Sequence, residues 1–204
     1  MKLLFILCLP ILILSASIEW RNVTYFHSKV ESYAMSLVSP DGSVHIFWQT
    51  FNEVRNRAIR YRKMLQDGAM TSTQNISKNY TPVVVRGGLS AKISEDGKHL
   101  VVAFVGYRMT TYETCEEHNT SGCMEIFFIE STDGGENWES PIRMNRANMS
   151  DKASRLQPAI LLEDTKRVYV MYTLNSGFAI SVREPNAKNF DNERSLNGTY
   201  QPGP

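Results

Sequence analysis

One pattern occurs three times in this chain and limits its fold more than any other feature. In each copy a short apolar segment leads into a polar turn that carries an aspartate, and a second apolar segment follows. The three turns are residues 39–42, 94–97 and 163–166. Aspartate, serine and glycine favour tight turns, and β-branched and aromatic residues favour strands. Each copy therefore predicts an antiparallel hairpin.

Further extended segments follow each hairpin, such as residues 59–62 in the first copy and 178–182 in the third. Four short strands per copy match the size of a propeller blade, and we expect three such units between residues 30 and 185. Helical character is confined to residues 65–69 and 148–156, so the expected fold is all-β. A β-sandwich is the alternative, because regularly spaced short strands also suit it. The repeated turn chemistry favours the propeller.

The most specific motif follows the apolar residues 126–129 and reads Ser131-Thr132-Asp133-Gly134-Gly135-Glu136-Asn137-Trp138. Aspartate followed by two glycines between extended segments indicates a hairpin turn, because glycine tolerates positive φ. The side chains of Ser131 and Asp133 can hydrogen-bond the backbone of their own turn. Trp138 begins the returning segment, where we expect its ring to pack under the turn. An ordinary Asp-Gly-Gly hairpin with a nearby tryptophan is the alternative.

The pattern Ser-x-Asp-x-Gly-x-x-Trp resembles the Asp-box of the sialidase-like β-propellers, and Ser131, Asp133, Gly135 and Trp138 fill its four positions. In that family the box is structural. It lies on the outer turn between the third and fourth strands of a blade, away from the site at the propeller axis. The resemblance therefore implies a fold more directly than an activity.

The resemblance covers nearly the whole chain after residue 30, but it yields about three blades, whereas a sialidase propeller has six. A partial ring leaves open sheet edges, at which association with other chains is expected. The box is degenerate in the other two copies. In the third copy we expect Ser181 to correspond to Ser131, with Arg183 in place of the aspartate.

The resemblance also implies sialidase chemistry, in which arginines clamp the carboxylate of sialic acid and a tyrosine activated by a glutamate is the nucleophile. Arg155 and Arg86 precede candidate inner strands and are the clamp candidates, although solvated strand-end arginines are the alternative. Tyr112 and Glu113 are a pair of the right type, but neighbours on a strand point to opposite faces. The family's first arginine has no counterpart within residues 32–36, which argues against a complete catalytic site.

The first residues have the three parts of a secretory signal peptide. Met1-Lys2 supplies the charge, residues 3–14 are almost entirely apolar, and Ser15-Ala16-Ser17 supplies small residues at the exit. The apolar run is shorter than the roughly 20 residues of a membrane-spanning helix. We expect cleavage after Ser17, which leaves residues 18–204 as a partial propeller domain that is secreted, at the cell surface or in the secretory lumen. An uncleaved signal anchor is the alternative.

Two cysteines remain beyond the signal segment. Cys115 and Cys123 bracket a polar stretch, residues 116–122, that lacks strand character. In an exported chain such a pair indicates one disulfide that ties off a loop. A metal site is not expected, because these two cysteines and His118 do not have the spacing of a tetrahedral site. No cofactor is implied.

Acceptor triplets for N-glycosylation agree with export. They are centred on Asn22, Asn75, Asn79, Asn119, Asn148 and Asn197. The formal net charge is +1, from 22 basic and 21 acidic residues, and no basic stripe points to nucleic acid.

Two functions are compatible with these observations. One is a sialidase-like glycoside hydrolase, an exo-α-sialidase if active, that acts on sialylated glycans but is partial or catalytically compromised. The other is a non-catalytic secreted Asp-box propeller that binds glycans or proteins.

Overall fold

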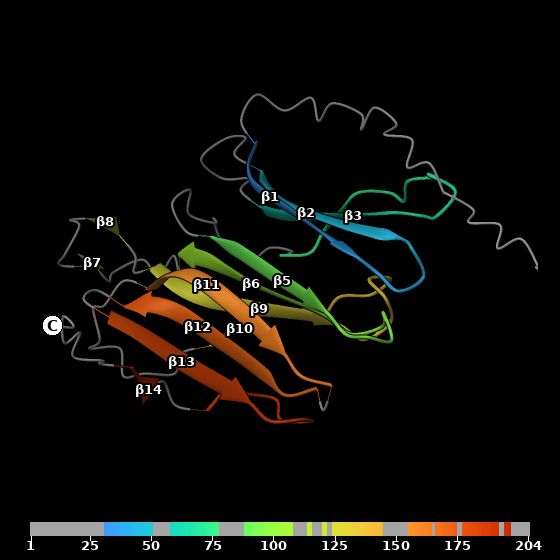
Figure 1. Ribbon diagram of the computed structural model, residues 1–204. Helices are drawn as coiled ribbons and strands as arrows, with labels where there is room; N and C mark the ends of the chain where they lie inside the picture. The colour runs from blue at the N-terminus through green and yellow to red at the C-terminus, as the bar shows by residue number, and fades with distance from the viewer. Residues whose placement is uncertain are drawn as a thin grey trace, which may run out of the picture.

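All regular structure in the described part of the chain is β-strand. The computed structural model describes residues 31–50, 58–77, 88–107, 114–115, 120–121, 124–144, 155–164, 166–174, 177–191 and 194–196. No helix occurs among these residues (Figure 1). The predicted all-β class is therefore confirmed, and residues 65–69 form a turn. The candidate strand in residues 18–30 lies outside the described residues.

The strands form three antiparallel sheets of four strands each. The first sheet consists of β1 (Glu31–Val38), β2 (Val44–Thr50), β3 (Ala58–Met64) and β4 (Gln74–Asn75). The second consists of β5 (Leu89–Ile93), β6 (Leu100–Tyr107), β9 (Met124–Ser131) and β10 (Ile142–Arg143). The third consists of β11 (Arg155–Leu162), β12 (Val168–Leu174), β13 (Gly177–Arg183) and β14 (Arg194–Ser195). These three meanders agree with the expected blades of a partial propeller.

A small extra hairpin interrupts the second sheet between β6 and β9. It pairs β7 (Thr114–Cys115) with β8 (Thr120–Ser121). Residues 116–122 were expected to lack strand character, but Thr120 and Ser121 pair with the backbone before them. These polar residues form a strand because backbone pairing in a short hairpin does not require apolar side chains.

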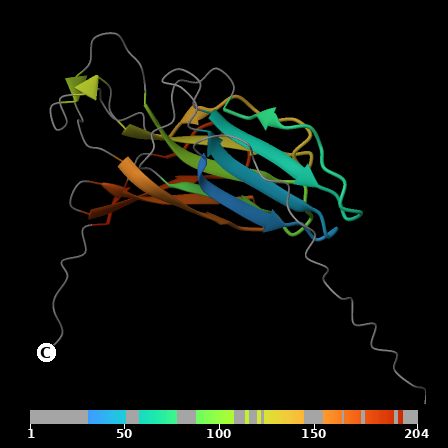
Figure 2. The ribbon, with the colours of Figure 1, turned by 90° about the horizontal axis from the view of Figure 1, so that it is seen from above.

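The second sheet lies between the other two (Figures 1 and 2). The first strands of the three sheets are neighbours in space, since β5 lies against β1 and β11. Residues 100–105 of β6 are at most 1% exposed. Their side chains alternate: Leu100, Val102 and Phe104 pack toward the first sheet, and Val101, Ala103 and Val105 toward the third. A strand with both faces covered reads as a continuous apolar run, which is the pattern of residues 100–105.

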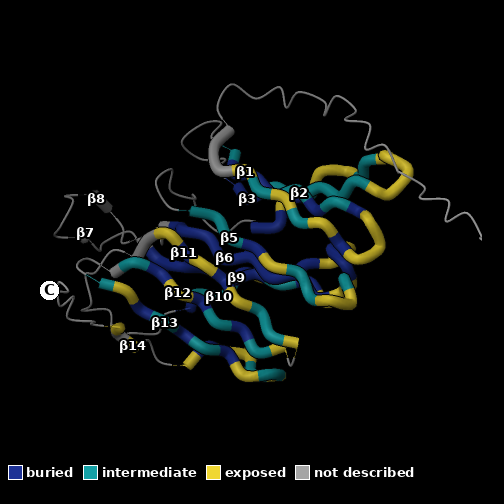
Figure 3. The backbone as a smooth tube through the Cα atoms, in the orientation of Figure 1, coloured by how far each residue is buried: buried dark blue, intermediate teal, exposed yellow. Residues whose placement is uncertain are grey.

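The third sheet buries only one of its faces. Val168, Val170 and Tyr172 pack against the second sheet. On the opposite face Leu161, Met171 and Phe178 are 57%, 42% and 52% exposed (Figure 3). By strand order, this face of the third sheet is equivalent to the face of the first sheet that packs on the second sheet. It is also equivalent to the face of the second sheet that packs on the third.

The turns of the three hairpins set a common register. Val38 pairs with Val44, Ile93 with Leu100 and Leu162 with Val168, so Val44, Leu100 and Val168 are equivalent positions. Ser39 and Ser94 begin the first two turns, and Asp41 and Asp96 accept backbone hydrogen bonds from residues two further on.

This register corrects one expected correspondence. Leu100 pairs with Ser131, and Val168 pairs with Arg183. Arg183, not Ser181, therefore occupies the place of Ser131 in the third sheet. The expected correspondence rested on the shared residue type of Ser181 and Ser131, whereas hairpin length determines which residues are paired across strands.

The Ser131–Trp138 turn joins the second sheet to the first. Ser131 Oγ donates to Asp133 Oδ1 over 2.8 Å and accepts from the N–H of Gly135 over 2.9 Å. Trp138 packs edge-on against Tyr61 of β3, with ring centroids 5.0 Å apart, and its indole N–H donates to the carbonyl of Gly135 over 3.1 Å. Gln74 beside β3 donates to the same carbonyl over 3.3 Å. The turn is thus held by its own polar side chains and by the neighbouring sheet.

Gly135 provides a test of this junction. Its φ is +90°, and a Cβ added there would overlap the hydroxyl of Tyr61. We expect Gly135→Ala to lower the free energy of unfolding by at least about 3 kcal/mol, since overpacking adds to the cost of the left-handed backbone. Urea titration followed by tryptophan fluorescence measures the loss.

Gly68→Ala is the matched control. Gly68 has a similar φ of +84°, but nothing lies within 4 Å of an added Cβ. Only the backbone cost of about 1 kcal/mol is expected there. Equal losses for both variants would show that the contact with Tyr61 does not stabilise the junction.

Candidate functional site

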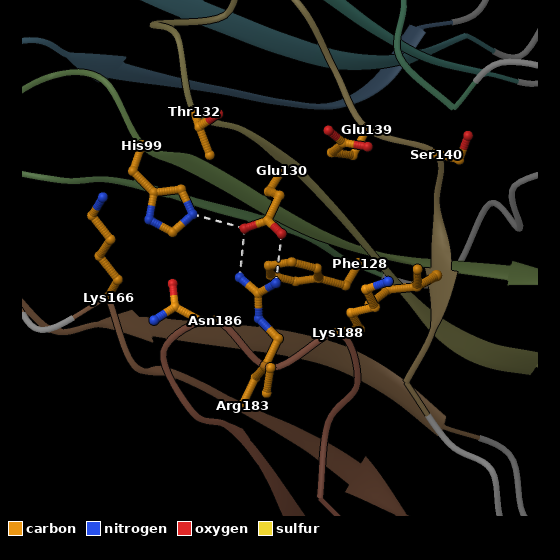
Figure 4. A pocket seen from close by; sticks show the side chains of 12 residues that line it. His99, Phe128, Glu130, Thr132, Glu139, Ser140, Lys166, Arg183, Asn186 and Lys188 are labelled. Atoms are coloured by element: carbon orange, nitrogen blue, oxygen red, sulfur yellow. Dashed lines mark hydrogen bonds and ion pairs between the residues drawn. The ribbon is translucent and has the colours of Figure 1, made fainter.

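A polar cavity of about 530 Å³ lies at the junction of the second and third sheets (Figure 4). It is placed at the end where β9 and β13 finish and where the β5–β6 and β11–β12 turns lie. Its charged and polar lining includes His99, Glu130, Thr132, Glu139, Ser140, Lys166, Arg183, Asn186 and Lys188. Phe128 is part of its apolar lining. The cavity is therefore formed by segments from two sheets.

A buried ion pair lies at the base of this cavity. Along β13 the inward positions are Ala179, Ser181 and Arg183, so the last of them carries a charge toward the second sheet. Both terminal nitrogens of Arg183 donate to the carboxylate of Glu130, each over 2.5 Å. The guanidinium also lies 4.7 Å from the centre of the Phe128 ring. Bidentate geometry and ring stacking are the contacts that suit arginine at a buried position.

His99 completes the network from the β5–β6 turn. Its Nε2 lies 2.8 Å from Glu130 Oε2, and its side chain is 5% exposed. Burial alone would raise the pKa of Glu130. The hydrogen bonds from His99 and Arg183, together with the charge of Arg183, outweigh burial and lower the pKa to about 2. Glu130 is therefore a carboxylate at neutral pH.

The Glu130 carboxylate determines which nitrogen of the His99 ring is left as a hydrogen-bond acceptor. Since Glu130 accepts a hydrogen bond from Nε2–H, the neutral ring of His99 carries its lone pair on Nδ1. His99 Nδ1 is buried and has no hydrogen-bond partner among the described protein atoms. A buried acceptor of this kind lowers stability unless a ligand hydroxyl or a water molecule donates a hydrogen bond to it. A lining residue of the cavity thus carries a buried ring nitrogen without a partner among the described residues.

Two of the lining residues have a left-handed backbone. Lys166 has φ +66° in the β11–β12 turn, and Asn186 has φ +65° after β13. Asparagine tolerates this region, whereas lysine does so at a cost of about 1 kcal/mol. Hydrogen bonds from Lys166 N–H to the Glu163 carbonyl and from Glu163 N–H to the Arg167 carbonyl hold the turn.

Of the two arginines expected from the sialidase resemblance, only Arg155 has a described backbone, and it lies away from this cavity. Arg155 begins β11, at the opposite end of the third sheet, and its side chain is outside the described part. Arg86, Tyr112 and Glu113 also lie outside the described residues, so their proposed roles stay predictions.

The other predicted sites are mostly outside the described residues as well. Cys115 is described only by its backbone in β7, and Cys123 is not described. Asn75 lies exposed in β4, where its side chain accepts a hydrogen bond from Ser77 over 3.0 Å. Asn22, Asn79, Asn119, Asn148 and Asn197 are not described.

Searches for two other kinds of site gave negative results within the described ranges. No group of three His, Cys, Asp or Glu side chains is placed to hold a metal ion. No helix long and apolar enough to cross a membrane occurs in the same ranges.

The sequence contained a signal for the cavity that residue-type searches missed. Glu130 directly follows five buried residues of β9, and Arg183 falls at an inward position of an alternating strand. Charged residues are almost never fully buried unless they are paired. Two such positions on neighbouring units are therefore candidates for an ion pair across the junction.

Comparisons with known proteins identify structures of similar fold but no family. No protein-family model matches the sequence, and no curated protein matches it. An ulvan lyase of polysaccharide lyase family PL25 superposes with a TM-score of 0.56 at 8% identity, over 84% of this chain and 45% of the lyase. The polysaccharide lyase Uly1 gives 0.50 at 10% identity, over 81% and 40%. A mutant of Trypanosoma rangeli sialidase gives 0.49 at 11% identity, over 79% and 30%.

The chain spans less than half the length of either lyase. At these identities the likeness to the lyases shows the fold alone. The three sheets share their fold with part of these lyases. The more specific assignment to sialidases stays a prediction.

The buried pair gives a pH-dependent prediction. The pKa of Glu130 falls from 4.5 to about 2 on folding, so its stabilisation is complete above pH 4.5 and is lost as pH falls toward 2. We expect Glu130→Gln to lower the free energy of unfolding by about 3 kcal/mol at pH 7, because Arg183 loses its counter-charge. The difference from the parent protein should shrink through this pH window, as measured by urea titration at each pH.

Glu95→Gln is the control, since Glu95 is exposed in the β5–β6 turn. It should change stability little at any pH. A Glu130→Gln deficit that stays constant from pH 7 to pH 2.5 would contradict the proposed charge pairing.

Proposed function

We propose that this chain is the glycan-binding part of an exported β-propeller-like protein, with the cavity between the second and third sheets as a ligand site. The observation that carries this proposal is the buried, unpartnered Nδ1 of His99 in a polar cavity. Sugars present hydroxyl groups that both donate and accept hydrogen bonds. The cavity offers matching groups from an imidazole, an amide, two hydroxyls and a carboxylate, on His99, Asn186, Thr132, Ser140 and Glu139.

The fold supports a carbohydrate ligand. The superposed PL25 ulvan lyase has also been solved bound to -[GlcA(1-4)Rha3S]-, with a TM-score of 0.55 to this chain. That ligand belongs to the lyase. For this chain the likeness supports a glycan as the class of ligand to test first.

Hydrolysis in this cavity is disfavoured by its electrostatics. A glycosidase acid needs a raised pKa so that it carries a proton at neutral pH. Glu130 has its pKa lowered to about 2 and both carboxylate oxygens occupied by Arg183. The cavity therefore suits binding.

An exo-α-sialidase activity at the other end of the sheets is the second candidate. The Ser131–Trp138 motif favours it, with Arg155 and Arg86 as the carboxylate clamp and Tyr112 and Glu113 as the nucleophile pair. Residues 32–36, where the family's first arginine is expected, lie largely in β1 and contain no arginine. A partial or compromised sialidase is the form that agrees with this departure.

The setting of this function is the secretory route. We propose removal of residues 1–17, a disulfide between Cys115 and Cys123, and glycans on the asparagine acceptors. The exposed side chain of Asn75 is accessible for such a modification. The exposed apolar face with Leu161, Met171 and Phe178 supports association with further sheets of the same kind.

The binding function predicts a specific loss in a glycan array. We expect secreted, glycosylated protein to bind at least one class of immobilised glycan, and His99→Phe to weaken that binding at least about 10-fold by removing the ring acceptor. His45→Phe is the control, because His45 is equally buried but bonds Tyr61 at the other junction. Circular dichroism verifies the fold of both variants. Binding that survives His99→Phe unchanged would exclude the cavity as the glycan site.

The sialidase candidate has its own measurement. A fluorogenic sialoside should be turned over by secreted protein if the chain is active, and Arg155→Ala should abolish that turnover. A rate no higher than that of a mock preparation would refute the enzyme candidate and leave the binding function in place.

A further inference from the structure

The rim of the cavity carries two lysines that take no part in the ion pair inside it. Lys166 and Lys188 come from different turns of the third sheet, and both are exposed. In the view of Figure 4 they flank the Glu130–Arg183 pair on opposite sides. Neither ammonium group forms an ion pair with another described residue. Two exposed cations at one cavity mouth repel each other unless an anion lies between or beside them.

The acidic groups of the cavity do not neutralise these lysines. Glu130 is fully engaged by Arg183 and His99. Glu139 is the other carboxylate in the lining. With His99 neutral, the charged lining residues are the cations Lys166, Lys188 and Arg183 and the carboxylates Glu130 and Glu139. Asp96, outside the lining, interacts electrostatically with Lys166. The excess of positive charge within the lining favours an anionic ligand by electrostatic attraction.

The backbone of Lys166 and the ring of His99 are held in place before a ligand arrives. Lys166 begins from a left-handed backbone position inside a turn closed by two hydrogen bonds. His99 is held at Nε2 by Glu130 over 2.8 Å, which leaves Nδ1 as the buried acceptor. Such preorganisation lowers the entropy cost of binding.

We propose that the cavity takes an anionic glycan, whose carboxylate or sulfate groups are met by Lys166 and Lys188 and one of whose hydroxyls donates to His99 Nδ1. This inference rests on the proposed glycan-binding function and names its ligand class. The site is separate from any site at the start of β11. That strand has eight residues, so its two ends lie roughly 23 Å apart at about 3.3 Å per residue.

Isothermal titration with three tetrasaccharides tests the ligand class. Hyaluronan tetrasaccharide carries carboxylates only, a κ-carrageenan tetrasaccharide carries sulfates only, and maltotetraose is neutral. We expect at least one anionic probe to bind at least about 10-fold more tightly than the neutral probe, with affinity that falls as salt rises. The two anionic arms identify which charged group the cavity prefers.

Variants locate the binding. Lys166→Asn removes the charge while suiting the left-handed backbone, and it is combined with Lys188→Gln. We expect the double variant to lose at least about 10-fold in affinity for the anionic probe and most of its salt dependence. Lys92→Gln, at an exposed position of β5 away from the cavity, is the control and should bind as the parent does.

The outcomes separate this inference from the proposed function. Equal binding of neutral and anionic probes, lost in His99→Phe but kept in the lysine double variant, would overturn the anionic class and support a neutral glycan site. Anionic binding unchanged in both variants would overturn the cavity as the site. Failure of all three probes, together with an empty glycan array, would overturn both.

Discussion

Burial of β6 on both faces is the constraint on which the rest of the described structure depends. Leu100, Val102 and Phe104 need an apolar neighbour on one side, and Val101, Ala103 and Val105 on the other. A single sheet cannot satisfy both sets, so the second sheet is stable only between two others. Its partner β9 follows the same rule, with Phe127 and Ile129 facing the first sheet and Ile126 and Phe128 the third.

The two junctions made by this central sheet close in different ways. Toward the first sheet the junction is tight and aromatic, with Trp138 and Tyr61 in contact over the glycine of the turn. Toward the third sheet the equivalent end carries Arg183 where the second sheet has Ser131. An arginine there reaches across to Glu130 and leaves a polar cavity above the pair. Ser131 and Arg183 thus occupy equivalent positions in the two sheets, and the candidate binding site lies at the junction that has the arginine.

The charge chemistry of the cavity explains why binding is better supported than hydrolysis. Glu130 is kept ionised by two basic groups, and its oxygens are directed into the protein. The groups left for a ligand are a ring nitrogen, an amide, hydroxyls, the Glu139 carboxylate and two lysines. They suit the proposed polar anionic ligand, and Glu130 lacks the raised pKa that a glycosidase acid requires.

The sequence by itself determined the three main hairpins and their turns, because alternation, β-branched residues and turns that carry an aspartate act locally. It also placed Ser131, Asp133, Gly135 and Trp138 in one turn. Tertiary structure decided the register that aligns Ser131 with Arg183, since hairpin length sets strand pairing. It alone decided the cavity, because Glu130 and Arg183 are 53 residues apart and meet only when the second and third sheets pack. Local patterns mark the two charged positions, but only that packing brings the two side chains together.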